Sequence, residues 1–324
     1  MRIVRPSLRT WLSIVAALVV AAGFAFWLSR DGARQVRDFS AAWENIGPAA
    51  ILLAALVALV QIVCQAGRFA VVARESAGIQ VLAAGRIFIF GQAANLFLPA
   101  RAGDLGKVAA TAATSSRGTR PEVASAAAIV LADKFVDATS MVLIALLVVP
   151  GALAQIDVPW LRPSPWWILG GALLVAAVLW LPLPVSWRAK IVVVAGKLRE
   201  TFRNMAHPRA IFLAFAVGFA AWTAETLGLH ILAVAVGYPL SPGALFTALI
   251  AVNIGTAIPL TPAQIGTFEA SLGYGLSLSG VPAGHGLVIA TIYHALQIAS
   301  VVVWSLVSYV SVLARARVAP SETG

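Results

Sequence analysis

The chain contains few charged residues. They make up 11% of its 324 residues, against 60% apolar residues, and the mean hydropathy is +0.90. Soluble domains contain about 25% charged and roughly 45–50% apolar residues. A water-soluble fold of this length could not bury so much apolar surface, whereas long apolar runs suit membrane-spanning helices. The sequence therefore predicts an all-α protein, a polytopic bundle of transmembrane helices.

Acidic residues and cysteine are scarcer still. Lys and Arg number 23 against 13 Asp and Glu, which gives a formal net charge of +10. In a soluble protein this excess would suggest nucleic acid, but here the basic residues lie mainly in short loops and at the termini. The positive-inside rule and anionic headgroups explain that placement, so we expect no nucleic-acid partner. The single cysteine, Cys64, lies in an apolar run and cannot form an intramolecular disulfide.

Enzyme signatures are mostly missing as well. Neither a Gly-x-Ser-x-Gly nor a Gly-x-x-x-x-Gly-Lys-Ser/Thr motif occurs, and the four histidines share no metal-ligand spacing. Asp133 and Asp137 are similar to a fragment of the aspartate pairs that hold Mg²⁺ on lipid pyrophosphates, but Lys134 between them argues against a metal. We therefore predict no metal site and no cofactor, and leave an embedded enzyme open.

Six apolar runs are long enough to cross a bilayer. The first follows three arginines but has no convincing small-residue cleavage site, so we interpret it as an uncleaved span. The most basic loop, residues 184–209, should be cytoplasmic, which places both termini in the cytoplasm of a multi-pass protein of the cell membrane. We expect residues 1–324 to form one integral membrane domain. The six predicted spans are residues 11–28, 46–66, 123–149, 166–181, 211–236 and 287–313.

Two further apolar stretches, residues 86–99 and 244–278, do not fit ordinary spans. The first is too short for a hydrocarbon core of about 30 Å and ends at Pro99. The second is split by Pro259, Pro262 and Gly266. Irregular backbone at membrane depth occurs only where it is buried in protein or lines a wet cavity. We interpret both stretches as re-entrant or broken helices; two ordinary tilted spans, eight in all, are the alternative.

The two stretches resemble each other. Each carries an asparagine, a proline, a glycine and an acidic residue in that order, and each lies between two full spans. The charge rule makes them enter from opposite sides, which predicts an inverted repeat of about residues 46–150 and 210–314 with a site between the halves. Chance similarity among Ala-rich segments is the alternative. The matching sets are Asn95, Pro99, Gly103, Asp104 and Asn253, Pro259, Gly266, Glu269.

Charged residues inside apolar runs indicate the candidate site, because a charge at the bilayer centre costs about 2.5–3.5 kcal/mol. Asp133 and Asp137 share a helical face, and Lys134 can reach Asp137. Arg101 would partner the remaining carboxylate or bind a phosphate with its planar fork; a structural salt bridge to Asp104 is the alternative. The candidates for substrate binding are Asn95, Arg101, Asp104, Lys134, Asp137, Asn253 and Glu269.

Proton coupling has three candidate residues. A buried Glu269 could take up a proton or engage a cation, or it could cap a helix that begins near Thr267. Glu225 lies in the span 211–236, where contact with a polar cavity wall is the alternative to a coupling role. The third candidate, His294, lies in the last span.

Residues 95–104, Asn-Leu-Phe-Leu-Pro-Ala-Arg-Ala-Gly-Asp, resemble the first hallmark of the flippase-like membrane region of lysylphosphatidylglycerol synthases. Lys134 and Asp137 match a later Arg-x-x-Asp pattern of that region. The resemblance covers about residues 46–313 and implies a multi-span protein that moves a lipid or lipid-linked headgroup between leaflets. The second hallmark, a Thr-Pro-Gly-Gly-x-Gly-x-x-Glu type run, is matched by Thr261, Pro262, Gly266 and Glu269.

The chain also departs from the family pattern. Lys134 replaces the usual arginine, Ala263 and Gln264 replace the paired glycines, and His294 stands at a basic position of the last helix. The synthases continue into a soluble aminoacyl-transferase domain, whereas this chain ends at Gly324, so we expect no lysine transfer to lipid.

Three functions follow as hypotheses. The favoured one is a flippase-like transporter whose partners are membrane lipids, anionic or phosphate-bearing. A membrane-embedded transferase acting on a lipid phosphate would instead require a divalent metal together with Asp133 or Asp137. A noncatalytic partner of a separate lipid-modifying enzyme would tolerate mutation of Arg101 and Glu269 but not of the basic loop. A homo-oligomer is compatible with each of these functions.

Overall fold

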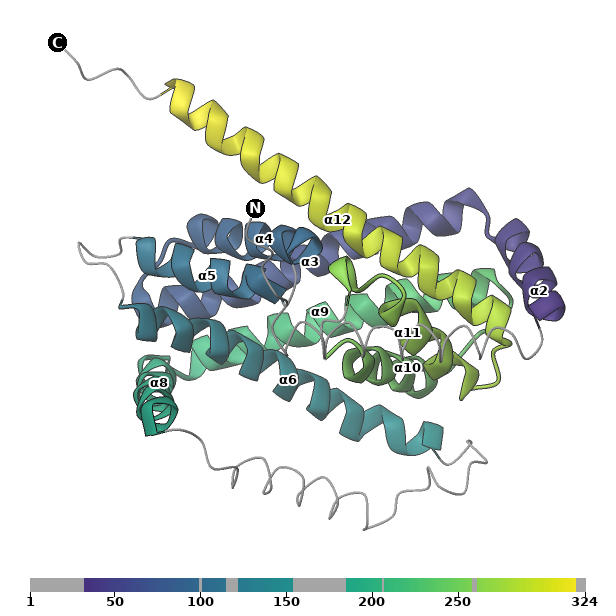
Figure 1. Cartoon of the computed structure of the whole chain (residues 1–324), viewed down its shortest axis with the longest axis horizontal. Helices are drawn as coiled ribbons and strands as arrows, with labels where there is room; N and C mark the ends of the chain where they lie inside the picture. The colour runs from purple at the N-terminus through teal and green to yellow at the C-terminus, as the bar shows by residue number, and fades with distance from the viewer. Residues whose placement is uncertain are drawn as a thin grey trace, which may run out of the picture.

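The computed structural model describes residues 32–98, 101–114, 122–153, 185–205, 207–257 and 261–318. These residues form ten α-helices and one 3-10 turn, with no strand among them (Figure 1). The predicted all-α class is confirmed. Two predicted spans, residues 11–28 and 166–181, lie outside the described residues, as do Pro99 and Pro259.

Three described helices are long and apolar enough to cross a membrane: Pro48–Ala77 (α3), Pro208–Ala235 (α9) and Ala283–Ala314, which belongs to α12 (Ala283–Val318). They coincide with the predicted spans 46–66, 211–236 and 287–313. Helix α6 (Val123–Leu153) coincides with the predicted span 123–149 and is 31 residues long, although it carries three charged residues. The chain is thus a helical membrane bundle.

Local sequence accounts for the ends of these helices. Prolines occupy the first turns of α3 and α9, where the missing N–H of proline costs no hydrogen bond. Helix α3 ends at Gly78, whose φ of 69° is accessible to glycine without strain, and its N–H donates to the carbonyl of Arg74 at 2.7 Å. The helix therefore continues eleven residues beyond the predicted end at Ala66.

The two irregular stretches form pairs of short helices. Helix α4 (Val81–Phe97) is followed by α5 (Ala102–Ala113), and α10 (Pro242–Gly255) is followed by a 3-10 turn (Pro262–Gln264) and α11 (Thr267–Ser277). At a rise of about 1.5 Å per residue, α4 is about 26 Å long and α10 is shorter. The predicted breaks in these stretches are confirmed, whereas their entry from opposite sides of the membrane stays a prediction.

Close backbone contacts hold each short pair together. A Cβ atom on Gly103 of α5 would lie 2.1 Å from the carbonyl oxygen of Gly91 in α4. A Cβ atom on Gly275 of α11 would lie 2.7 Å from the Cα atom of Ala248 in α10. Only glycine permits the helices to approach this closely.

The described helices form two halves with the same order of lengths. Helices α3, α4, α5 and α6 run long, short, short, long, and α9, α10, α11 and α12 repeat that order. Helices α3 and α9 pack antiparallel, because the position of Gly67 faces Val217 whereas that of Gly228 faces Val57 (Figure 1).

Two flanking helices complete the described bundle. Helix α2 (Gly32–Asn45) packs against α12, and α8 (Val185–Asn204) packs against α6. The segment 184–209, predicted as a basic loop, is therefore largely helical.

Two apolar clusters stabilise the bundle by close packing, because van der Waals contact rather than exclusion of water drives helix association in a membrane. The first joins α9, α10, α11 and α12, and includes Phe246 and Leu272. The second joins α3, α4 and α6, and includes Phe69 and Ile129. Polar side chains gather between the two clusters, where the short pairs meet the long helices.

Candidate functional site

A polar cavity of about 280 Å³ lies inside the bundle. Apolar residues of both clusters border it, among them Phe88 and Phe268, but most of its wall is polar. Buried charge of this density is costly in a membrane protein and marks a functional region. The charged residues and histidine that line the cavity are Arg68, Arg101, Asp104, Lys107, Asp133, Lys134, Asp137, Glu225 and His294.

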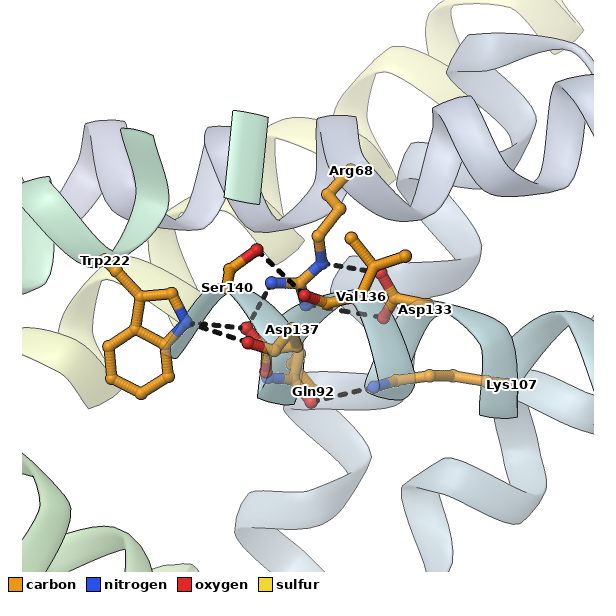
Figure 2. A network of polar contacts seen from close by, with 8 residues as sticks. All are labelled: Arg68, Gln92, Lys107, Asp133, Val136, Asp137, Ser140 and Trp222. Carbon is orange, nitrogen blue, oxygen red and sulfur yellow. Dashed lines mark hydrogen bonds and ion pairs between the residues drawn. The ribbon is translucent and has the colours of Figure 1, made fainter. Parts of the chain in front are cut away.

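Arg68 lies at the centre of one ion-pair network in the cavity wall (Figure 2). Its side chain is 3% exposed, and its Nε donates to Oδ1 of Asp133 at 2.8 Å. Its Nη1 donates to Oδ1 of Asp137, which also accepts from Nε1 of Trp222 at 3.1 Å. One guanidinium thus compensates two carboxylates on one face of α6, four residues apart.

This network corrects two predictions. The predicted span 46–66 ends before Arg68, but Arg68 lies within α3 and is buried in the cavity wall. We also expected Lys134 to pair with Asp137, but its Nζ lies 2.9 Å from Oδ2 of Asp104 instead. The reason is geometric: Arg68 of α3 occupies the face of α6 that carries Asp133 and Asp137, whereas Lys134 points toward α5.

Asp104 is the centre of a second network. Its Oδ1 lies 3.0 Å from Nζ of Lys107, so two lysines share this one carboxylate. The same Nζ of Lys107 donates to Oε1 of Gln92 at 3.0 Å and lies 4.5 Å from the ring centre of Phe88. Two cations around one anion leave this side of the cavity with excess positive charge. The neighbouring Oδ1 of Asn95 is buried and has no hydrogen-bond partner among the described residues.

Arg101 connects the two irregular stretches. Its Nη2 donates to the carbonyl oxygen of Thr256, at the end of α10, at 3.2 Å. When the side-chain amide of Gln264 is flipped so that its oxygen faces Arg101, this oxygen accepts a second hydrogen bond from Nη2 at 2.8 Å. Within the described ranges, Arg101 forms no ion pair with Asp104 or any other carboxylate. Both carboxylate pairings that we weighed for Arg101 are therefore wrong.

Backbone strain is concentrated where the two stretches meet. In the described part of the chain, the non-glycine residues with positive φ are Arg101 (53°), Ala263 (49°) and Gln264 (61°). Each such conformation costs of order 1–3 kcal/mol, and strain of this kind clusters at functional sites. All three residues line the cavity.

Glu269 has the predicted capping role, and its carboxylate makes a second contact. It lies in the first turn of α11, which begins at Thr267, and its Oε2 accepts from the N–H of Gly266 at 2.6 Å, so it caps the helix. Its Oε1 lies 2.7 Å from Nδ1 of His294, whose ring stacks on Phe268 with centroids 4.1 Å apart. Two of the candidates for proton coupling are therefore in direct contact.

Glu225, the third candidate, lines the cavity near the Arg68 network. The side chains of Gln61 and Gln297 lie beside its carboxyl group, and its backbone carbonyl accepts from the hydroxyl of Tyr293 at 3.0 Å. The predicted contact with a polar cavity wall is observed, and a coupling role stays a prediction.

Most of the predicted site residues come together. Eight of them line the cavity directly: Asn95, Arg101, Asp104, Lys134, Asp137, Glu225, Asn253 and His294. Glu269 does not line it but contacts His294. Gly103, Pro262 and Gly266 do not line the cavity but shape the turns beside it.

Sequence reasoning missed several lining residues. Gln61, Gln65 and Arg68 recur at four and three residues' spacing, so they form one polar stripe along an otherwise apolar α3. That stripe was the signal for a helix face turned toward a polar interior. Lys107, three residues after Asp104, also follows the helical spacing of an ion pair.

The described residues offer no metal centre of ordinary composition. Among them, no three His, Cys, Asp or Glu side chains lie where they could hold one ion. The chemistry that the cavity supports is the binding of a charged group by arginine, lysine and carboxylate side chains.

A comparison with known protein families agrees with the helical membrane fold. The family model described as the lysylphosphatidylglycerol synthase TM region matches residues 14–305. The chain belongs to this family. The family region includes both irregular stretches and every described charged residue of the cavity, which connects the chain with membrane-lipid function. No curated protein and no solved structure matches the chain.

Trp222→Phe is expected to lower the free energy of unfolding by about 1 kcal/mol, since a buried hydrogen bond to Asp137 is lost while Arg68 still compensates the charge. Thermal unfolding in detergent measures the change. Trp43→Phe is the matched control, because Trp43 is 55% exposed. Equal melting temperatures for the two variants would contradict a role for Trp222 in holding Asp137.

Proposed function

We propose that the chain moves the phosphate-bearing headgroup of a membrane lipid between the two leaflets. The observation that carries this proposal is the polar cavity between the two short helix pairs, inside a bundle whose helices are apolar. A charged headgroup needs a polar path through the hydrocarbon core, whereas the lipid tails can stay in the bilayer. Family membership supports a function connected with lipids.

Arg101 is the residue placed to bind the phosphate. Its guanidinium contacts neutral oxygens only, at Thr256 and Gln264. A phosphate would offer a charge-assisted, bidentate pair of hydrogen bonds, which are roughly twice as strong as neutral ones. Lys107 and Lys134 share one carboxylate nearby and add to the attraction for an anion.

The two halves of the bundle supply the path in this proposal. We interpret them as an inverted repeat, with the short pairs entering from opposite sides, because α3 and α9 pack antiparallel and the two turns meet at Arg101. Alternating opening at either end would then expose Arg101 to each leaflet in turn. We place both termini in the cytoplasm of a cell-membrane protein, since the basic segments 184–209 and 315–317 follow the positive-inside rule.

Transport in proteoliposomes tests the proposal. Arg101→Gln is expected to slow leaflet exchange of a fluorescent phospholipid or prenyl phosphate about tenfold or more, because a hydrogen bond to a charged group contributes about 1.5–3 kcal/mol. Arg86→Gln is the matched control, since Arg86 of α4 donates to Ser311 outside the cavity. Unchanged exchange in Arg101→Gln, or no exchange of any lipid by folded wild-type protein, would contradict the proposal.

The same assay addresses proton coupling. Glu269→Gln keeps the size of the side chain but removes its charge from the contact with His294. If Glu269 couples transport to protons, a pH gradient accelerates exchange by the wild type and has no effect on the variant. An equal response of both proteins would remove Glu269 from that role.

The embedded transferase is the second candidate, but the contacts favour it less. Such an enzyme would use the pair of aspartates in α6, whereas Arg68 already engages both. Product formation from a lipid phosphate that depends on Asp133 would support the enzyme over the transporter. A noncatalytic partner protein would instead keep its function in Arg101→Gln.

A further inference from the structure

Helix α8 lies across the end of the bundle. Figure 1 shows α8 end-on, whereas α6 and α9 run across the view. It packs where α3 ends: Nδ2 of Asn204 donates to the carbonyl of Ser76 at 3.5 Å, and the ring of Phe202 contacts Phe135 of α6 with centroids 5.3 Å apart. Because the long helices cross the bilayer, a helix that runs across them at this end lies along the membrane surface.

The inner and outer faces of α8 differ in character. Its inner face buries Thr201, and Leu198 and Phe202 pack on the cluster of α3, α4 and α6. Near its middle, α8 also carries exposed apolar residues: Val192 is 70% exposed, and its neighbours Ile191 and Val193 are about half exposed. Exposed apolar residues at a membrane surface are stable only if they enter lipid or meet a partner.

The second half of the outer face is basic. Arg199 and Arg203 are exposed, lie one helical turn apart and form no ion pair within the described ranges. By contrast, Lys197 of the same helix lies 3.3 Å from Glu200 and 3.7 Å from Glu122. The two arginines are therefore free to bind an external anion.

The surroundings of α8 favour lipid as that anion. In the described part of α8 from residue 191 and the neighbouring residues 74–75, 122 and 207–209, five side chains are basic and three, Glu75, Glu122 and Glu200, are acidic, so this region attracts negative charge. An apolar segment followed by basic residues on one helix is the pattern of interfacial helices on anionic membranes. The five basic residues are Arg74, Lys197, Arg199, Arg203 and Arg209.

We propose that α8 is an interfacial helix that binds anionic phospholipids of its own leaflet. Residues 191–193 enter the boundary between headgroups and acyl chains, and Arg199 and Arg203 bind the phosphate groups above it. This surface is separate from the cavity and does not depend on lipid transport. It fixes the end of the bundle at a defined depth, next to the start of α9.

The first test measures the depth of α8. A bimane label is placed at Val192→Cys in a Cys64→Ala background, and the protein is reconstituted in nanodiscs that contain phosphatidylglycerol. We expect strong quenching by a nitroxide on the lipid acyl chain and little quenching by aqueous iodide. A label at Glu122→Cys, an exposed polar position at the same end, is the control and should respond to iodide. Equal iodide quenching at both positions would overturn the proposal and leave the face open to a soluble partner.

The second test measures lipid preference. Energy transfer from the bimane to acyl-labelled NBD-phosphatidylglycerol is compared with transfer to NBD-phosphatidylcholine in the same nanodiscs. Each basic residue near an anionic surface favours it roughly fivefold, so Arg199→Gln with Arg203→Gln should reduce the local preference for phosphatidylglycerol at least about fivefold. Arg37→Gln, at an exposed position of α2, should leave it unchanged. Equal transfer to both lipids in the wild type, or an unchanged preference in the double variant, would overturn the proposal.

Discussion

Arg68→Met is expected to lower the free energy of unfolding by about 3–5 kcal/mol, the cost of leaving buried charges without a partner. The Arg68 side chain is 3% exposed and compensates Asp133, whose side chain is 6% exposed, together with Asp137. Methionine retains most of the side-chain volume, so the loss of stability reports the missing charge rather than a change in packing. Unfolding in detergent, followed by circular dichroism against temperature or denaturant, detects the change.

Two further variants make this prediction specific. Arg74→Met on the same helix removes an exposed arginine and should change stability by no more than about 0.5 kcal/mol. Adding Asp133→Asn and Asp137→Asn to Arg68→Met should recover much of the loss, because the uncompensated carboxylates are then gone. An Arg68→Met protein as stable as Arg74→Met would show that the network is not essential to the fold.

Gly103→Ala and Gly106→Ala are expected to change stability in opposite directions. A Cβ atom at position 103 would lie 2.1 Å from a backbone oxygen of α4, so the helix pair must separate at a cost of about 1–3 kcal/mol or more. Position 106 has no atom within 4 Å of the added carbon, so alanine there should stabilise α5 by roughly 0.5–1 kcal/mol.

The comparison of these two variants needs only relative melting temperatures. Both positions lie on one twelve-residue helix and undergo the same chemical change, so helix propensity contributes equally to both. A Gly103→Ala protein as stable as Gly106→Ala would contradict the close contact of α4 and α5. Because Gly103 is two residues from Arg101, transport should also fall in Gly103→Ala but not in Gly106→Ala.

Much of the fold was predictable from hydropathy alone. The long spans and the two broken stretches are local properties, since each depends on the apolar character and turn residues of one segment. Helix α3 was predicted too short because Arg68 resembled the start of a loop. Its charge is compensated by carboxylates of α6, the nearer of them 65 residues further along the chain. The polar stripe on α3 indicated a polar interior, but it could not show which residues compensate Arg68.

The sequence predicted which residues belong to the candidate site, but not which cation pairs with which carboxylate. Charges inside an apolar run identified Lys134 and Asp137, because a charge is costly within the hydrocarbon core, and the repeated motif after Asn95 identified Asp104. Which cation meets which carboxylate depends on the rotation of each helix. Lys134 meets Asp104 because α5 lies beside α6, an arrangement that the spacing of residues within α6 could not indicate.

Neighbouring cations and amides compensate the buried carboxylates of the cavity. Every carboxylate that lines it lies beside a cation or an amide, and Arg101 alone among its arginines contacts only neutral groups. In the proposed function, a lipid phosphate binds at this position and supplies the missing anion. The strained backbone at Arg101, Ala263 and Gln264 then lies where the bound headgroup would have to pass.

Photo-crosslinking shows whether a lipid headgroup enters the cavity. A phospholipid with a diazirine in its headgroup is irradiated with the reconstituted protein, and the labelled residues are identified by mass spectrometry. We expect labels on cavity-lining residues such as Gln92, Asn95, Asn253 and Gln264, reduced in Arg101→Gln but not in Arg86→Gln. Labels confined to the outer faces of the long helices, for example at Leu52 and Leu306, would contradict a headgroup path through the cavity.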